Sequence, residues 1–101
     1  MSSDDPYLKL IDEQWSNIMM VYATFRAKKP IIEYDITKEK IFSYPAEEYI
    51  EALSIRTREQ TRKQYKEAVR KNQFILFIKD RKNQKLRSYI FDLPARRSYG
   101  A

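Results

Sequence analysis

A β-hairpin is encoded in the segment FILFIKDRKNQKLRSYIFDLP, residues 74–94. Apolar, β-branched and aromatic residues lie on both sides of a polar stretch. The segment therefore predicts strands over residues 74–79 and 85–93, joined by a turn over residues 80–84. Pro94 ends the second strand because proline has no N–H group to donate to a sheet.

The segment IIEYDITKEKIFSYP, residues 31–45, has the same pattern. It predicts a hairpin with strands over residues 31–36 and 41–44 around a polar turn. The two hairpins together predict a sheet of four antiparallel strands.

A long amphipathic helix is predicted before the first hairpin. Asp5 followed by Pro6 is typical of an N-cap and a first helical residue. Apolar residues then recur at spacings of three and four as far as Phe25, which indicates one apolar face. Pro30 ends this segment.

One or two further helices are predicted between the hairpins. Pro45 can open a helix, and the glutamates that follow it favour the helix N-terminus. Ser54 or Thr57 then breaks or recaps the chain, and Thr57 with Gln60 has the spacing of a capping box. A single helix over residues 45–72 is the alternative.

The order of these elements predicts an α+β fold. Its simplest arrangement is a two-layer sandwich, in which a four-stranded antiparallel sheet is covered by helices on one face. Residues 1–101 are expected to form a single domain, with a polar lead-in over residues 1–5 and a mobile basic tail over residues 95–101.

The second half of the chain also resembles a winged-helix DNA-binding domain. In that alternative fold, residues 45–73 would hold the recognition helix and residues 74–91 the wing. The chain departs from the winged-helix pattern at two points. The inter-helix turn around residues 54–56 has no glycine, and the segment between the first two helices is a full hairpin.

The residue types that are missing exclude several kinds of chemistry. The chain has no cysteine and no histidine, and its single glycine is Gly100. Disulfides, Ser-His or Cys-His nucleophiles and glycine-rich phosphate loops are therefore excluded. We expect a non-enzymatic protein without a metal site or cofactor, located in the cytoplasm. Its apolar runs are much shorter than the roughly 20 residues of a membrane span.

Charge is unevenly distributed along the chain, whose formal net charge is +6. Residues 1–54 hold six Lys or Arg and ten Asp or Glu, a net of −4, whereas residues 55–101 hold fourteen and four, a net of +10. The acidic half cannot neutralise this excess, so some cationic surface should stay free for a negatively charged partner.

The positive residues fall in three places: the predicted helix after residue 55, the second hairpin and the tail. On a helix, Arg58, Arg62, Lys66 and Arg70 would form a continuous ridge, because they recur every four residues. Such a ridge is either a solvated face or a surface for a polyanion. The predicted binding residues are Arg56, Arg58, Arg62, Lys63, Lys66, Arg70, Lys71, Arg81, Lys82, Lys85, Arg87, Arg96 and Arg97.

Two functions are compatible with these residues. The first is a small accessory or regulatory module that binds nucleic acid through the basic helix and the basic hairpin turn, with Tyr65, Tyr89 or Tyr99 available to stack on a base. The second is an adaptor or inhibitor that docks on an acidic protein surface. The first helix could in addition form a homodimer if the sheet does not cover its apolar face.

Overall fold

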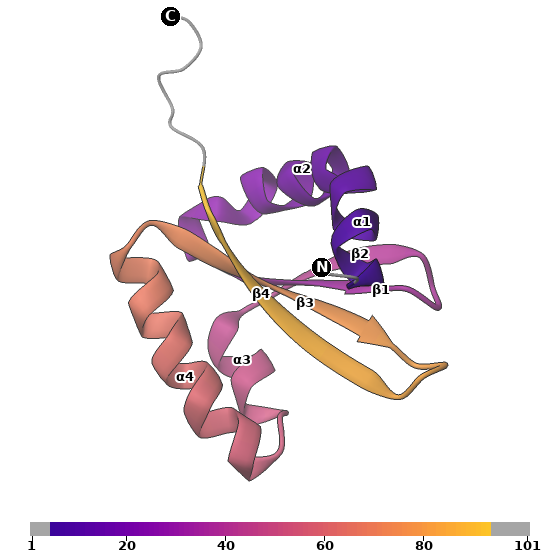
Figure 1. The fold of residues 1–101 in the computed structure, drawn as a ribbon. Coiled ribbons are helices and arrows are strands. Elements are labelled where there is room, and N and C mark those ends of the chain that lie inside the picture. Colours follow the sequence, from indigo (N-terminus) through magenta and orange to yellow (C-terminus); the bar gives the residue numbers. More distant parts are fainter. Residues whose placement is uncertain (1–4, 94–101) are drawn as a thin grey trace, which may run out of the picture.

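A single four-stranded sheet forms the centre of the molecule (Figure 1). The computed structural model describes residues 5–93, so most of the predicted lead-in and the whole predicted tail, with Arg96, Arg97 and Tyr99, lie outside the described residues. The strands, in sheet order β2-β1-β3-β4, are β1 (Ile31–Asp35), β2 (Lys40–Tyr44), β3 (Gln73–Asp80) and β4 (Lys85–Asp92).

Both predicted hairpins are confirmed, but the sheet is mixed. β1 pairs antiparallel with β2, and β3 pairs antiparallel with β4. The two central strands β1 and β3 are parallel, with Ile32 opposite Leu76 and Tyr34 opposite Ile78. The prediction of an entirely antiparallel sheet was therefore wrong. Parallel pairing is possible because the segment that joins β1 to β3 contains a strand and two helices, which is long enough to return to the same end of the sheet.

Helices precede both hairpins, as the sequence predicts. They are α1 (Pro6–Glu13), α2 (Trp15–Phe25), the short 3-10 helix η1 (Arg26–Lys28), α3 (Ala46–Glu51) and α4 (Ile55–Arg70). Asp5 is the N-cap of α1, and its side chain accepts a hydrogen bond from the Tyr7 N–H. Ser54 is the N-cap of α4, and its Oγ accepts from the Thr57 N–H at 3.4 Å. The capping box with Thr57 as N-cap was therefore wrong, because α4 begins at Ile55 and Thr57 is already in its first turn.

The first helix, predicted as continuous, is interrupted at Gln14, whose backbone leaves the helical region with φ −100° and ψ 9°. α1 lies over β3 and β4, where the Tyr7 hydroxyl donates to Asp80 Oδ2 at 2.5 Å. α2 packs on β1 and β2. Because the sheet is twisted, one straight helix could not stay in contact with all four strands. The break at Gln14 lets the apolar residues of α1 and α2 together cover them.

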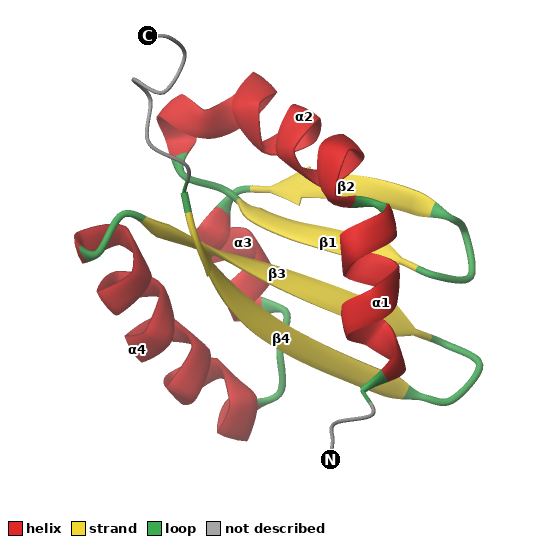
Figure 2. Ribbon diagram, turned by 45° about the horizontal axis from the view of Figure 1, so that its top comes forward, coloured by secondary structure: helices red, strands yellow, loops and turns green. Residues whose placement is uncertain are grey.

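The helices cover both faces of the sheet, and the prediction that they pack on one face was wrong. Figure 2 shows α1 and α2 on one side and α3 and α4 on the other. One core cluster joins the first pair of helices to Ile32 and Leu76, and a second joins Ile50 of α3 and Ala68 of α4 to Ile75 and Phe77. The architecture therefore has three layers, and the predicted alternative, a winged helix, is not adopted.

A repeat of the helix–hairpin unit explains this arrangement. Each half of the chain runs from helices into a hairpin, and β1 and β3, the first strands of the two hairpins, are parallel neighbours. A half-turn about an axis that runs along the strands, between β1 and β3, would relate two idealised units of this kind, and it exchanges the faces of the sheet. The helices of the two units must then lie on opposite faces.

Candidate functional site

The outer face of α4 carries a row of exposed cations. Thr61 and Ala68 are buried towards the sheet, and the residues on the opposite side of the helix, among them Arg56, Lys63 and Lys66, are exposed. This division follows from the helical period, because positions seven residues apart lie on one side of a helix. We call Arg56, Lys63, Lys66, Arg70 and Lys71 the outer α4 surface.

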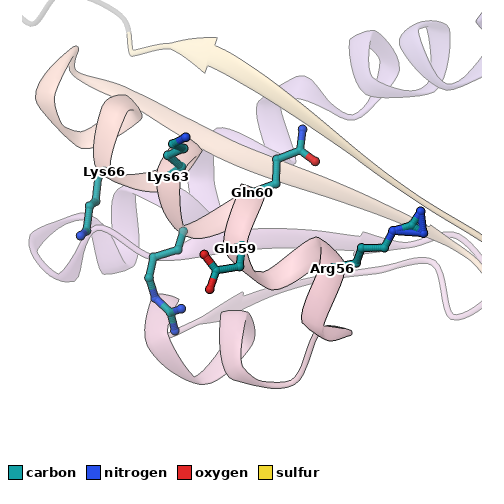
Figure 3. A pocket seen from close by; sticks show the side chains of 6 residues that line it. Arg56, Glu59, Gln60, Lys63 and Lys66 are labelled. Atoms are coloured by element: carbon teal, nitrogen blue, oxygen red, sulfur yellow. The ribbon is translucent and has the colours of Figure 1, made fainter.

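A shallow hollow lies on this surface (Figure 3). Figure 3 shows Arg56 near one end of α4 and Lys66 further along the helix, with Lys63 and Gln60 pointing to one side of it and Glu59 and Lys66 to the other. Within residues 5–93, Arg56, Lys63 and Lys66 form no ion pair. Six ion pairs occur there, and all involve other cations. These three charges are therefore available to a partner.

Two members of the predicted ridge, Arg58 and Arg62, contact α3 and are only partly exposed, although Arg62 also lines the hollow. Arg62 Nη2 lies 2.8 Å from Glu51 Oε2 and 3.3 Å from Glu47 Oε1. The hydrogen bond to Glu47, followed by that to Glu51, raises the pKa of Arg62. Arg58 Nη2 donates to the backbone oxygens of Glu51 and Leu53, at 3.1 and 3.2 Å. Both arginines thus fasten α3 to α4, and the continuous ridge predicted from the sequence is interrupted.

The C-terminal end of α4 is partly neutralised. The Glu67 carboxylate pairs with Arg70, and it lies 3.6 Å from Lys71 Nζ. All three side chains are at least half exposed, so these pairs are weak and would exchange readily for a phosphate. This end therefore contributes a net charge of +1.

The basic residues of the second hairpin do not join the outer α4 surface. Arg81 Nε lies 3.1 Å from Asp35 Oδ2 near the turn, and Arg87 lies 3.5 Å from Asp5 on the face covered by α1. Lys82 and Lys85 are exposed. In Figures 1 and 2 the turn between β3 and β4 lies apart from α4. The structure therefore does not bring the hairpin and helix cations together in one patch.

The carboxylates next to the hairpin are held in their charged form. The Tyr89 hydroxyl donates to Asp5 Oδ2 at 2.7 Å, and this bond contributes most to the lowered pKa of Asp5. Burial and the same bond raise the pKa of Tyr89 to about 12. The Tyr7 hydroxyl likewise lowers the pKa of Asp80. This cluster attaches α1 to the sheet, which is a structural role.

The tyrosines considered for base stacking are engaged in the fold. Tyr89 is bonded to Asp5 as described, and the Tyr65 hydroxyl donates to the Lys29 backbone oxygen at 2.6 Å. Both rings are partly buried and pack against the core clusters. Neither presents a free platform for a base.

A second basic group, missed in the sequence, lies beside α4. Arg26, Lys28 and Lys29 follow α2 in η1 and its cap, are exposed, and are brought to α4 by the Tyr65 bond to Lys29. In the sequence these cations are explained by the dipole of the preceding helix. The hydrogen bond between Tyr65 and the Lys29 backbone, 36 positions apart in the chain, is what places this segment next to α4.

Other kinds of site have no support within the described chain. No group of three or more Asp, Glu, His or Cys residues in 5–93 is arranged to hold a metal ion, and no helix of that range is long and apolar enough to cross a membrane. Comparison with protein-family models, curated proteins and solved structures found no match to this chain.

Proposed function

We propose that this protein is a non-enzymatic accessory or regulatory module that binds the phosphate backbone of nucleic acid through the outer α4 surface. The observation that carries the proposal is the set of three exposed cations without an ion-pair partner in residues 5–93, Arg56, Lys63 and Lys66, around one hollow. Cations of this kind release counterions from phosphates, which is the main source of non-specific affinity for nucleic acid.

The spacing of these cations suits a row of phosphates. A rise of about 1.5 Å per residue places Arg56 and Lys66 about 15 Å apart along the helix axis. One DNA strand presents a charge about every 3.4 Å along the duplex axis, so this length corresponds to about four phosphates. Arg70 and Lys71 extend the surface by a further turn and a half.

Binding of this type should be independent of sequence. Long flexible cations on an exposed helix face contact phosphates, which position a protein but carry no base identity. Arg58 and Arg62, which the sequence assigned to the binding surface, are held by α3. We therefore expect their replacement to alter stability more than binding.

Fluorescence anisotropy with labelled duplex and single-stranded oligonucleotides across a salt series tests the proposal. Three phosphate contacts give a slope of log K against log salt of about −2.7 on duplex DNA and about −2.1 on single strands. A fourfold rise in salt then weakens duplex binding about 40-fold. If Arg70 and Lys71 take part, the slope reaches about −4.5.

A charge-matched pair of variants locates the surface. The triple change Arg56→Gln, Lys63→Gln, Lys66→Gln should abolish most of the salt-dependent affinity. The control triple Lys9→Gln, Lys38→Gln, Lys40→Gln removes the same charge from α1 and the first hairpin, and should leave the slope unchanged. Equal losses in the two triples, or no binding at low salt, would refute the proposal. Binding to polyglutamate but to no oligonucleotide would favour docking on an acidic protein.

A further inference from the structure

We propose that the free edge of β4 is a dimerisation surface, on which a second copy of the chain pairs its own β4 antiparallel to form an eight-stranded sheet. This inference is independent of the proposed function, because it rests on the opposite end of the sheet from β2 and uses none of the outer α4 surface.

β4 presents a complete row of backbone hydrogen-bonding groups. The Leu93 N–H donates to the Asn72 oxygen at 3.1 Å, which continues the β3–β4 register by one residue. Backbone groups point alternately to the two sides of an antiparallel strand. Since Leu93 bonds towards β3, the N–H and C=O groups of Leu86, Ser88 and Ile90 point outwards.

The edge lacks two of the devices that normally prevent pairing, a bulge and a proline, although it carries the charges of Lys85, Arg87 and Asp92. Its register with β3 runs without a bulge from Asp92 to Lys85, and β4 contains no proline. It has eight residues, which is long for an edge strand. Within residues 5–93 no other strand pairs with its outer side.

Two apolar side chains on this strand are partly exposed. Leu86 is 43% exposed and Ile90 is 40% exposed. They stand opposite Lys79 and Ile75 of β3, on the face that carries α3 and α4. α4 packs on β3 and leaves these two side chains partly exposed.

Self-pairing selects one register. Two copies related by a two-fold axis perpendicular to the sheet keep the same face continuous, and the register centred on Ser88 places Leu86 of each copy opposite Ile90 of the other. Cross-strand apolar pairs of this kind are the usual stabilising unit of a sheet. A shift by two residues in either direction places Leu86 opposite Ser88 or Asp92, so only the Ser88-centred register pairs all four exposed apolar side chains.

The other face is complementary in the same register. A hollow between β4, α1 and the start of α2 is lined by Leu8, Ile11, Asp12, Trp15 and Phe91. The residue opposite Phe91 is Lys85 of the second copy, whose hydrocarbon stem can lie on these apolar walls while its ammonium group approaches Asp12. Arg87 stands opposite Tyr89 of the second copy, an arrangement that allows a cation–π contact.

The response to salt distinguishes dimerisation from nucleic-acid binding. Two copies of a chain with a net charge of +6 repel each other, and salt screens that repulsion. The dimer should therefore strengthen as salt rises, whereas binding to phosphates should weaken. Either behaviour can fail without the other.

Sedimentation velocity over a range of protein concentrations and salt tests the dimer. We expect a species of twice the 12.2 kDa chain mass, more populated at high salt. Ser88→Pro removes the outward N–H at the centre of the interface without removing a β3 bond, and should give a monomer, whereas Ser88→Ala should remain dimeric. A chain that stays monomeric up to about 1 mM overturns the proposal, because even weak association is populated there.

Cysteine crosslinking tests the register without depending on the folding of the proline variant. The chain has no cysteine, so a single introduced thiol has no competitor. Ser88→Cys should form a disulfide-linked dimer on mild oxidation, because directly opposed residues have Cα atoms about 5.5 Å apart. Leu86→Cys is the matched control, since its two copies lie four residues apart along the strands. Equal crosslinking of the two variants, or of neither, contradicts the Ser88-centred pairing.

Discussion

Replacement of Arg58 by methionine tests whether this arginine stabilises the fold, in contrast to the exposed cations of α4. Arg58 Nη2 donates to the backbone oxygens of Glu51 and Leu53, the last carbonyls of α3 and the link to α4. A hydrogen bond from a charged donor contributes about 1.5–3 kcal/mol, and one buried atom, Nε, lacks a partner and offsets part of this gain. Methionine retains the apolar stem, so we expect a loss of about 2 kcal/mol in the free energy of unfolding.

Urea and thermal unfolding, followed by circular dichroism, measure this loss. For a chain of this size a change of about 2 kcal/mol lowers Tm by about 8–16 °C. Lys66→Met is the matched control, because it removes the same charge from an exposed position of the same helix and should change stability by less than about 0.5 kcal/mol. Equal stabilities for the two variants would show that Arg58 does not hold α3 against α4. They would refute the distinction between structural and exposed cations on α4.

Three further predictions concern single side chains. Tyr49→Phe should lower the free energy of unfolding in urea by about 1–3 kcal/mol, because it removes the 2.6 Å hydrogen bond to the buried Glu33 carboxylate; Tyr44→Phe, the control, should have little effect. Burial and the hydrogen bond to Asp5 raise the pKa of Tyr89 from 10 to about 12. The stabilisation contributed by this hydroxyl is therefore complete below pH 10 and is lost as the pH rises towards 12. In alkaline unfolding, Tyr89→Phe should show a shallower loss of stability over that range. Glu39→Gly should raise stability by about 0.5–1 kcal/mol in the same urea assay, because Glu39 has a φ of 53°, and an unchanged or lower value would contradict this.

The local elements could be predicted from the sequence because their signals are local. The alternation and turn residues of residues 31–45 and 74–94 define both hairpins, and Asp5 with Pro6 defines the start of α1. The long-range arrangement could not be predicted in this way. Nothing near β1 or β3 encodes their parallel pairing, and the same apolar stripes fit helices on one face or on both.

The candidate site, like the fold, could be predicted from the sequence only in part. The exposure of Arg56, Lys63 and Lys66 follows from the helical period, which the sequence contains. Arg62 pairs with Glu47 and Glu51 because α3 folds back on α4. The position of η1 likewise depends on a contact between distant parts of the chain. Charge counts along a sequence do not distinguish cations that are paired across such contacts from those that are free.

A titration of the isotopically labelled protein with an oligonucleotide, followed by amide chemical shifts in NMR, tests the central claim most directly. At low salt, the largest shift changes should fall on residues 56–71 and extend to residues 26–29, and they should disappear as salt rises. Changes centred on the turn at residues 81–87 or on α1, or no change at any salt concentration, would contradict the assignment of binding to the outer α4 surface.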